Sequence, residues 1–574
     1  MTQKLKGIGA SSGISISKTY VLKQPDFHVT KHDVSDIEAE KNKYQNALDL
    51  TVTQLNQIKS IANDKLGSDK AEVFEAHVQI ANDPEIKNEI WTTIEQDKCN
   101  IDFIVDKVYD KYRDIFKAMD DPYFKERAAD IVDVKKRLLS NLLGINLPDI
   151  MSINQEVILV AHDLTPSETA LLDRKFIKGF VTEIGGRTSH AAIMARTMEI
   201  PAVLGVENIL QKISDNLIIA INGNSGEVEI EPAYLIEWQN KKAAYEKEHE
   251  ELKKYINVET KTLDGHKVHV ESNVGKPIDA TLALQYGAEG VGLYRSEFLY
   301  MDNDHWPTED EQYEGYKSVL EKMNKKLVVV RTLDIGGDKK LSYFQFPAEM
   351  NPFLGWRAIR VCLAKPDIFR TQLRALGRAS VHGKLGIMFP MIATIDEFLQ
   401  AKEFAHKIFA ELKQEGHSVS DEIQIGMMVE IPASAALAAQ FAKHADFFSI
   451  GTNDLIQYTF ACDRMSQNVA YLYQPNNPAL LKLIKMTIDG GHTNKRWVGM
   501  CGEMAGDPTS IPLLLGLGLD AFSMSSTSMP KARMIINNLH LSECQALAEE
   551  ALKLQTFKEV NDLVAKFLTS KNLI

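Results

Sequence analysis

Side chains suited to binding an anionic substrate follow several apolar segments in the second half of the chain. They are Arg295, Glu297, Arg331, Asp334, Glu430, Asn453, Asp454, Cys501 and Glu503. Arginine offers a planar fork of donors that matches phosphate and carboxylate oxygens. A carboxylate pair such as Glu430 and Asp454 suits Mg²⁺, which binds through one or two carboxylates plus substrate phosphate oxygens. The set predicts a site for a small, highly anionic phosphorylated molecule.

Three members of this set also have a purely structural interpretation. Arg295 and Arg331 could form ion pairs with Glu297 and Asp334 at the rim of a domain. A lone cysteine such as Cys501 is usually an inert buried residue, but a thiol at a strand end can exchange a proton near neutral pH if its surroundings move its pKa. We favour a role in the site, because so many reactive side chains follow strand-like segments.

A second constellation is the glycine-rich segment at residues 185–196, GGRTSHAAIMAR. Its two glycines permit a tight loop, and Thr188 or Ser189 can cap the helix that the Ala/Ile/Met run continues. His190 then lies in the first turn, where exposed N–H groups and the helix dipole favour a bound anion. Although a lone histidine is more often structural, an imidazole at this place can accept a phosphoryl group as a nucleophile.

The first set lies on a repeated pattern of strand, turn and helix from about residue 261 to the end. The predicted strands are residues 268–273, 290–294, 327–333, 386–390, 425–429, 447–450, 497–500 and 521–524. Helical patterns lie between most of them, for example at 309–323, 394–415 and 433–443. Eight such units in roughly 300 residues are typical of a (β/α)₈ barrel, whose active site lies at the carboxyl ends of the strands. An open doubly wound sheet is the alternative.

The rest of the chain divides into three predicted regions. Residues 1–24 and 145–232 contain short apolar strand segments and a helix that begins after Thr165, which predicts an α/β domain. Residues 25–144 have long helical patterns and few prolines, which predicts an all-α bundle of two or more long helical hairpins. Residues 233–260 contain a charged, strongly helical segment at 235–254 and form a predicted linker to the barrel at 261–574.

Composition restricts the possible partners and location. The 574 residues include 65 basic and 78 acidic side chains, a formal net charge of −13, which argues against nucleic acid as the main partner and suits a basic protein. Five cysteines without a CxxC pair indicate neither a disulfide framework nor a zinc site. No apolar run is long enough to span a membrane, and the first residues lack the apolar core of a signal peptide, so we expect a cytoplasmic protein.

Five motifs together resemble a known family. They are GGRTSHAAIMAR at 185–196, DIGGDK at 334–339, GWRAIR at 355–360, SIGTNDL at 449–455 and GMCGE at 499–503. The chain resembles, over essentially its whole length, the phosphoenolpyruvate-protein phosphotransferases, which are Enzyme I of the bacterial sugar phosphotransferase system. That family is related to the pyruvate-phosphate dikinases and phosphoenolpyruvate synthases.

The resemblance implies a role for each candidate residue. His190 would be phosphorylated on Nε2, and Thr169 would orient it. Residues implied to bind phosphoenolpyruvate are Arg295, Arg331, Asn453, Asp454 and Arg464, with Lys339 and Arg357 as further site positions of less defined role. Glu430 and Asp454 would ligate Mg²⁺. Cys501 would donate a proton to the enolate carbon as pyruvate forms.

The resemblance also implies a two-step relay and its partners. The phosphoryl group would pass from phosphoenolpyruvate to His190 and then to a histidine of the phosphocarrier protein HPr, the first step of the sugar phosphotransferase system. The phosphohistidine α/β domain must swivel, because one imidazole cannot face the barrel and HPr together. The helical insertion would dock HPr, with the acidic segment at 69–89 as a candidate surface, although a solvated helix face explains that segment equally well. A homodimer through the barrel is also implied.

Two other functions compete with this one. A dikinase or phosphoenolpyruvate synthase would need an additional large nucleotide-binding domain, and no glycine-rich loop of the P-loop kind precedes residue 155. A non-catalytic scaffold could bind the phosphocarrier and sense phosphoenolpyruvate without turnover. The complete residue set argues against the scaffold.

Overall fold

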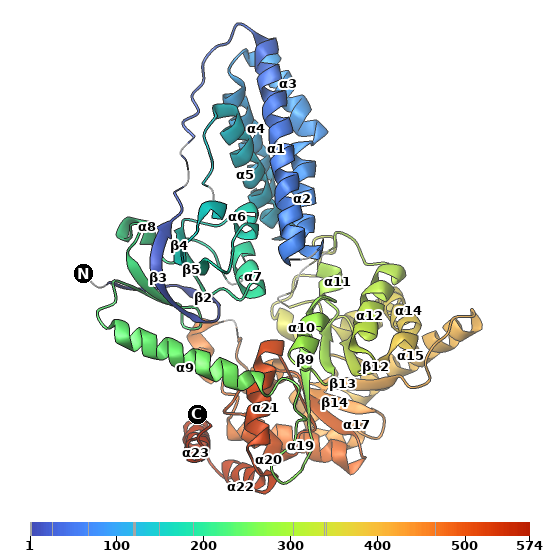
Figure 1. Ribbon diagram of the computed structural model, residues 1–574. Coiled ribbons are helices and arrows are strands. Elements are labelled where there is room, and N and C mark those ends of the chain that lie inside the picture. Colours follow the sequence, from blue (N-terminus) through green and yellow to red (C-terminus); the bar gives the residue numbers. More distant parts are fainter. Residues whose placement is uncertain are drawn as a thin grey trace. The chain divides into compact units, whose positions relative to one another are not determined.

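The computed structural model describes residues 3–23, 25, 27–66, 68–118, 122–148, 150–186, 189–301, 303–337, 339, 341–464 and 466–573. The chain forms two compact units, Met1–His249 and Glu250–Ile574, which are the blue-to-green and green-to-red parts of Figure 1. None of the helices in the described part of the chain is long and apolar enough to cross a membrane.

The N-terminal unit contains a bundle of long helices that run alongside one another (Figure 1). These are α1 (Ile37–Leu66), α2 (Ser68–Ala81), α3 (Pro84–Asp97), α4 (Ile101–Ala118) and α5 (Pro122–Leu143). Their core is made of buried side chains such as Tyr44, Ile90 and Leu138. Asp83 caps α3, because its carboxylate accepts hydrogen bonds from the N–H groups of Glu85 and Ile86.

The remainder of the N-terminal unit is an eight-stranded sheet with the order β1-β8-β7-β3-β4-β5-β6-β2. The strands are β1 (Gln3–Lys6), β2 (Ile8–Ser11), β3 (Ile14–Val21), β4 (Val157–Ala161), β5 (Ile177–Thr182), β6 (Ala202–Leu204), β7 (Ile218–Asn222) and β8 (Glu227–Ile230), and the helices are α6 (Pro166–Ala170), α7 (His190–Thr197) and α8 (Ile209–Lys212). Strands β3 and β4 are parallel neighbours in this sheet, so the helical bundle is an insertion between two adjacent strands. The α/β domain with an inserted all-α bundle is thus confirmed.

The C-terminal unit is built on a closed barrel of eight parallel strands. They are β9 (His269–Val274), β10 (Val291–Arg295), β11 (Leu327–Arg331), β12 (Lys384–Phe389), β13 (Gln424–Val429), β14 (Phe447–Ile450), β15 (Trp497–Met500) and β16 (Ala521–Met524). The last three have the predicted bounds, and the ends of the others differ from prediction by one or two residues. The predicted barrel is confirmed, and the open doubly wound sheet is excluded.

Helix α9 (Leu235–Lys253) precedes the barrel in the chain, and further helices surround the barrel. They are α10 (Asp279–Gln285), α11 (Phe298–Met301), α12 (Glu309–Met323), α13 (Ile359–Ala364), α14 (Pro366–Ala379), α15 (Ile395–Gln414), α16 (Pro432–Ala436), α17 (Ala438–Phe441), α18 (Thr452–Phe460), α19 (Pro478–Thr493), α20 (Ile511–Leu517), α21 (Met529–Asn537), α22 (Leu541–Ala551) and α23 (Phe557–Ser570). Capping boxes begin α12, α15 and α23, where a threonine and the glutamate three residues later satisfy each other's backbone N–H groups.

One predicted helix is divided in the structure. Residues 433–443 were expected to form a single helix, but α16 and α17 are separated at Leu437, whose ψ of 19° is not helical. Helix α17 lies so close to α19 that a Cβ atom at Gly490 would come within 2.7 Å of the Ala438 side chain. We attribute the break to this close packing, which a periodicity of apolar residues does not reveal.

The barrel interior is filled by a cluster that includes Val329, Met388, Met428 and Phe447. The rings of Phe447 and Trp497 stack with centroids 4.6 Å apart. The barrel is therefore a packed core with its functional groups at the strand ends, as expected for this architecture.

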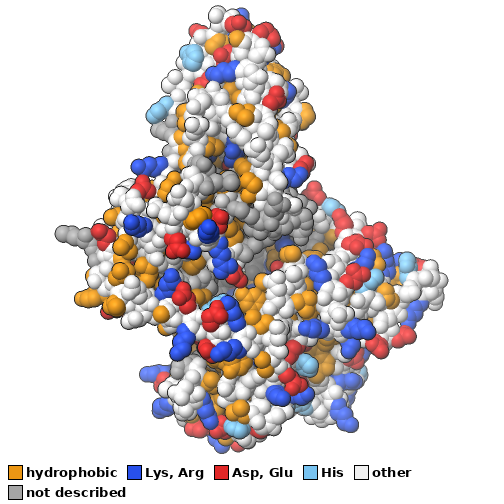
Figure 2. All heavy atoms as spheres, viewed as in Figure 1, with side chains coloured by type: hydrophobic (Ala, Val, Ile, Leu, Met, Phe, Trp, Pro, Cys, Tyr) orange, Lys and Arg blue, Asp and Glu red, His pale blue; other side chains and the backbone are white. Residues whose placement is uncertain are grey.

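On the face shown in Figure 2, acidic and basic side chains are interspersed over the surface.

Candidate active site

Reactive side chains from five strands meet at the carboxyl end of the barrel. Arg295 ends β10 and Arg331 ends β11, and these two residues are register partners on neighbouring strands. Glu430, Asn453 with Asp454, and Cys501 follow β13, β14 and β15, respectively. Parallel strands in a closed barrel end at one face, so these groups surround a single mouth. Arg331 is buried there, whereas Arg295 is exposed.

Asp334 is the first of two carboxylates that hold the cations of the mouth together. Its Oδ2 lies 3.1 Å from Arg331 and 2.9 Å from Lys339, and its Oδ1 lies 2.9 Å from Arg357. Burial alone would raise the pKa of Asp334, but the charges of the three cations outweigh it and hold that pKa well below its usual value. Asp334 therefore stays ionised and fixes the three cations around itself.

Glu297 reinforces this arrangement. Its Oε1 forms ion pairs with both Arg331 and Lys339, the latter at 2.9 Å. The sequence did not decide whether Arg331 forms ion pairs with Glu297 and Asp334, and in the structure it forms both. A buried ion pair of this kind orients a guanidinium group, so the pairing does not remove Arg331 from the set that faces the mouth.

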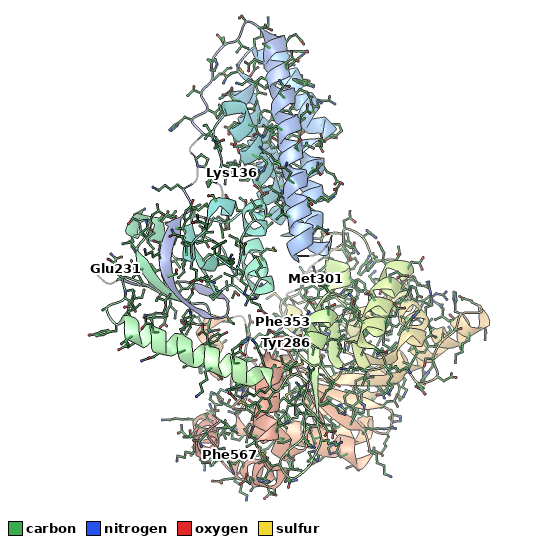
Figure 3. All side chains as sticks on the ribbon, in the orientation of Figure 1. Lys136, Glu231, Tyr286, Met301, Phe353 and Phe567 are labelled. Atoms are coloured by element: carbon green, nitrogen blue, oxygen red, sulfur yellow. The ribbon has the colours of Figure 1, made fainter. Side chains whose placement is uncertain are left out.

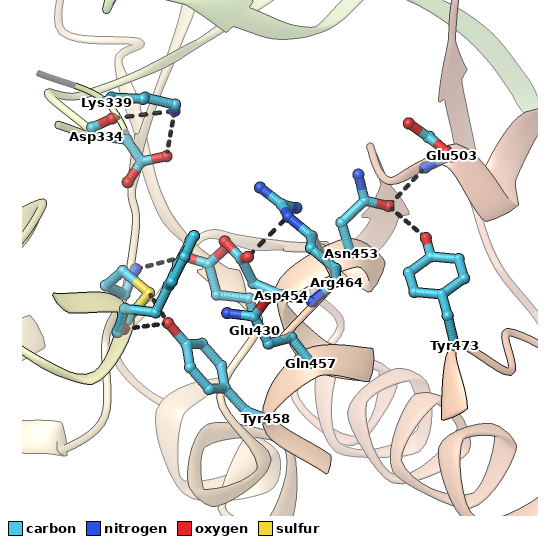
Figure 4. Close-up of polar contacts among 12 residues, drawn as sticks. Asp334, Lys339, Glu430, Asn453, Asp454, Gln457, Tyr458, Arg464, Tyr473 and Glu503 are labelled. Carbon is cyan, nitrogen blue, oxygen red and sulfur yellow. Dashed lines mark hydrogen bonds and ion pairs between the residues drawn. The ribbon is translucent and has the colours of Figure 1, made fainter. Parts of the chain in front are cut away.

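Asp454 is the second carboxylate that joins cations, and Figure 4 shows its contact with Arg464. Its Oδ2 lies 3.4 Å from Arg357, and its Oδ1 lies 3.4 Å from Arg464. Beside it, Asn453 Oδ1 accepts hydrogen bonds from the Tyr473 hydroxyl at 3.2 Å and the Glu503 N–H at 3.4 Å. Arg357 thus connects Asp334 to Asp454, which joins the groups of β11 to those of β14.

Glu430 lies buried beside Asp454. Its Oε1 accepts the N–H of Met391 at 2.6 Å. Burial, together with the negative charges of Asp454 and Asp334, raises the pKa of Glu430 to about 8. Positive charge placed between Glu430 and Asp454 would reverse this shift.

The two carboxylates fit a magnesium ion. Oδ1 of Asp454 is buried and accepts no hydrogen bond, although it forms an ion pair with Arg464. Glu430 is crowded by negative charge, which a cation bound between the two carboxylates would relieve. Among the described residues, no group of three or more His, Cys, Asp and Glu side chains is arranged as a metal cage. Mg²⁺ does not need one, because it takes one or two carboxylates and completes its shell with water and substrate phosphate oxygens.

Cys501 follows β15 and is only 5% exposed. Its N–H donates to the Ile450 carbonyl at 3.1 Å, and the thiol contacts the Ser449 side chain. Burial raises the pKa of the thiol, and the hydrogen bond with Ser449 and the charge of Arg331 offset this only in part. The thiol therefore keeps its proton at neutral pH, as a proton donor must.

The candidate nucleophile lies in the N-terminal unit. His190 is the first residue of α7, and the Ser189 hydroxyl caps this helix by accepting the Ala192 N–H at 3.3 Å. The expected helix start is therefore present. Arg187 and Thr188 lie outside the described residues, as does the side chain of His190.

Thr169, the predicted partner of His190, lies buried in α6, which packs against α7. Its hydroxyl donates to the Pro166 carbonyl at 2.9 Å. The helical bundle holds α6 in place, since Lys136 of α5 forms an ion pair with Glu168 at 2.6 Å (Figure 3). The orienting role of Thr169 stays a prediction.

Three acidic side chains of the segment at 69–89 have local partners. Glu75 forms an ion pair with Lys59, and Glu89 forms one with Lys111 at 2.7 Å, while Asp83 caps α3. The side chains of Asp69 and Glu72 lie outside the described residues. Docking of a partner on this segment also stays a prediction.

Comparison with known proteins agrees with this geometry. Three family models match the chain, described as "PEP-utilising enzyme, N-terminal" over residues 6–127, "mobile domain" over 153–226 and "PEP-binding domain" over 249–541. Phosphoenolpyruvate-protein phosphotransferases from Mycoplasma capricolum, Listeria innocua and Staphylococcus aureus are 53%, 52% and 52% identical to it. Each alignment covers 99% of this chain and 100% of the relative. The chain belongs to the phosphoenolpyruvate-protein phosphotransferase family.

Membership of this family divides the candidate residues between two matched regions. The mobile-domain match includes Thr169 and His190, and the PEP-binding match includes every candidate residue of the barrel mouth.

The sequence did not identify several groups that hold this site together. Tyr458 contacts Arg357 at 3.3 Å, Met391 supplies the N–H for Glu430, and Asn273 donates to the Cys501 carbonyl at 3.0 Å. Tyr458 and Met391 could be found only from the folded structure. Asn273, by contrast, ends a predicted strand, so the rule that singled out the other strand ends also applied to it.

Proposed function

We propose that this enzyme transfers the phosphoryl group of phosphoenolpyruvate to its own His190, releasing pyruvate, and then passes it to a histidine of the phosphocarrier protein HPr. This would be the first step of a sugar phosphotransferase system. The observation that carries the proposal is the convergence of five cations, the carboxylates of Glu430 and Asp454 and a protonated thiol on one barrel mouth. That mouth belongs to a chain about half identical to enzymes of this name along its whole length.

The charges of the mouth suit a phosphorylated acid bound together with a metal ion. Arg295, Arg331, Asn453 and Arg464 would hold the phosphate and carboxylate groups, with Lys339 and Arg357 behind them. The carboxylates Glu297, Asp334 and Asp454 offset much of the charge of the five cations, and a cation bound beside Glu430 would ionise that group as well. Mg²⁺ held by Glu430 and Asp454 would neutralise phosphate charge and stabilise the group being transferred.

The chain's own residues carry the chemical steps. His190 Nε2 attacks phosphorus as the bond from phosphorus to the enolate oxygen breaks. The Cys501 thiol then gives its proton to the enolate carbon, and pyruvate leaves as the keto acid. The thiolate regains its proton from water before the next turnover.

The predicted domains have distinct parts in this relay. Residues 1–24 and 145–232 would carry His190 between two stations, and the helical linker at 233–260 would permit that swivelling movement. Residues 25–144 would dock HPr. Residues 261–574 would bind phosphoenolpyruvate and join two copies in a cytoplasmic homodimer. The acidic composition and the family resemblance support these assignments.

Incubation of the full chain with ³²P-labelled phosphoenolpyruvate and Mg²⁺ tests the proposal. We expect an acid-labile, base-stable phosphoprotein, which added HPr discharges. His190→Ala should abolish labelling while phosphoenolpyruvate binding, measured by calorimetry, stays within about twofold, because the barrel residues are unchanged. Substantial labelling of His190→Ala would contradict the assignment.

The same experiment separates the competing functions. Labelling of His190 by ATP would favour a dikinase or phosphoenolpyruvate synthase. Binding of phosphoenolpyruvate and HPr without any labelling would favour a non-catalytic scaffold. We expect neither outcome.

A further inference from the structure

The backbone around Cys501 is held unequally by its two neighbouring strands. On the β14 side, the Cys501 N–H pairs with the Ile450 carbonyl at 3.1 Å, and Gly502 packs so closely on Thr452 that no side chain would fit between them. On the β16 side, strand pairing extends only to Met500 and Phe522. Regular pairing with β16 therefore ends one residue before Cys501.

Asn273 holds Cys501 from this second side. It lies near the end of β9, the strand beyond β16, and its Nδ2 donates to the Cys501 carbonyl at 3.0 Å. The amide side chain thus reaches Cys501 from β9, although β16 lies between β9 and β15 in the barrel. Cys501 is fixed from both sides only because this contact exists.

Ser523 sets the orientation of the Asn273 amide. Its hydroxyl donates to Asn273 Oδ1 at 2.7 Å, so the amide oxygen faces Ser523 and the NH₂ group faces Cys501. A reversed amide would place two carbonyl oxygens against each other and lose the hydrogen bond to the Cys501 carbonyl. Ser523 and Asn273 thus form a two-residue support for the backbone that carries the thiol.

We propose that Asn273, oriented by Ser523, is a positioning residue that aims the Cys501 thiol at the enolate carbon of the bound substrate. The inference rests on the proposed function, in which Cys501 is the proton donor. In that step the S–H bond breaks, the π electrons of the enolate form a new C–H bond at the methylene carbon, and the enolate oxygen becomes the keto oxygen. Transfer of this kind is sensitive to distance, and a misplacement of 1 Å can cost about a hundredfold in rate.

The test measures how faithfully the proton is delivered. Phosphoenolpyruvate carrying tritium at one geometric position, E or Z, of its methylene group is converted by the full-length enzyme in D₂O, and the chirality of the resulting methyl group of pyruvate is analysed. Delivery from a fixed thiol labels one face. Enolate that escapes unprotonated takes deuterium from solvent on both faces, which gives a racemic methyl group.

We expect Asn273→Ala and Asn273→Asp to lose most of this facial selectivity and about tenfold in kcat for pyruvate, with KM changed less than about twofold. Ser523→Ala should show the same change more weakly. The matched control is Ser526→Ala, which removes the 2.8 Å hydrogen bond between Ser272 and Ser526 near the same end of the barrel without touching Cys501. This control should stay fully selective. Should Asn273→Ala fail to fold, the isosteric Asn273→Asp and Ser523→Ala carry the test.

Cys501→Ala separates failure of this inference from failure of the proposed function. Full selectivity in Cys501→Ala would show that another group protonates the enolate and would overturn the role of Cys501. Lost selectivity in Cys501→Ala with full selectivity in the Asn273 and Ser523 variants would overturn the inference alone. Equal losses in Ser526→Ala and Asn273→Ala would also overturn it, because any loosening of the barrel end would then suffice.

Discussion

Arg357 and its neighbour Ala358 show how single residues hold the site in shape. Arg357 is buried, contacts both Asp334 and Asp454, and lies over the Phe353 ring at 5.9 Å. Ala358 has φ 54° and ψ −126°, a conformation that L-residues rarely adopt. Its N–H donates to the Ile335 carbonyl at 3.0 Å. Arg357 joins Asp334 to Asp454, and the strained backbone lies directly after it. Strain at this place is consistent with a backbone conformation set by the site rather than by local preference.

Glu271 is a carboxyl group buried inside the barrel, and it gives the first prediction. Its oxygens lie over Gly290 and Gly292, where an added Cβ atom would come within 2.9 and 2.5 Å of them. Burial and the charge of Glu289 raise the pKa of Glu271 to about 7, above the ordinary value near 4.5. The folded barrel therefore binds a proton that the unfolded chain has released, and its stability falls as pH rises from about 4.5 to 7, by about 3 kcal/mol in all.

Glu271→Gln should remove this dependence. The variant should be more stable than the parent enzyme at pH 8, by up to about 3 kcal/mol, and no more stable at pH 4.5. Urea unfolding of the C-terminal unit at the two pH values measures the difference, with the exposed Glu549→Gln as control. A pH slope that is the same in Glu271→Gln and in the parent would contradict the prediction.

At the scale of elements, short helix α6 depends on the bundle beside it. Thr165 and Glu168 form its capping box, Asp133 of α5 accepts the Ser167 N–H at 3.1 Å, and Lys136 pairs with Glu168. A helix of five residues has little stability of its own. The contacts from α5 therefore hold α6, and with it Thr169, against α7.

The ion pair between Lys136 and Glu168 gives the second prediction. The two side chains are 14% and 11% exposed, so removal of one charge leaves the other poorly solvated. We expect Lys136→Met to lower the free energy of unfolding of the N-terminal unit by about 2 kcal/mol. The double variant with Glu168→Gln should lose less than the sum of the single variants.

Urea unfolding measures this coupling, and the pair Lys41–Glu95 serves as the control. Its side chains are 23% and 62% exposed, and we expect a coupling of no more than about 0.5 kcal/mol there. If the losses in free energy of unfolding of the Lys136 and Glu168 single variants add up to that of the double variant, α6 is held by packing alone.

Elements buried on both faces were the ones that sequence predicted best. Strands such as β14 and β15 are short apolar runs between polar turns, and their bounds matched. The three-residue strand β6 is too short to show a period of apolar residues, and the break at Leu437 comes from contact with α19.

In the site, the rule that the carboxyl ends of parallel strands meet at one face placed Arg331, Glu430 and Cys501 together. The roles of Asp334 and Asp454 as carboxylates shared between cations depend on distances that no spacing in the sequence encodes.

At the scale of the whole molecule, the division of labour between the two units predicts how they unfold. Each unit has its own hydrophobic core, and all candidate ligands of phosphoenolpyruvate lie in the C-terminal unit. A ligand stabilises only the unit that binds it, by about 2.7 kcal/mol at a concentration a hundred times its Kd. For a unit of this size, that free energy corresponds to a rise in Tm of about 4 °C.

Calorimetry of the His190→Ala variant, which lacks the proposed phosphoryl acceptor, should therefore resolve two transitions. Phosphoenolpyruvate with Mg²⁺ should raise the Tm of the barrel transition by about 4 °C and leave that of the N-terminal transition unchanged. Glu430→Gln with Asp454→Asn should abolish the part of the shift that requires Mg²⁺, since those carboxylates are its proposed ligands. Equal shifts of both transitions would mean that binding couples the two units, and the substrate site would then have to extend beyond the barrel mouth.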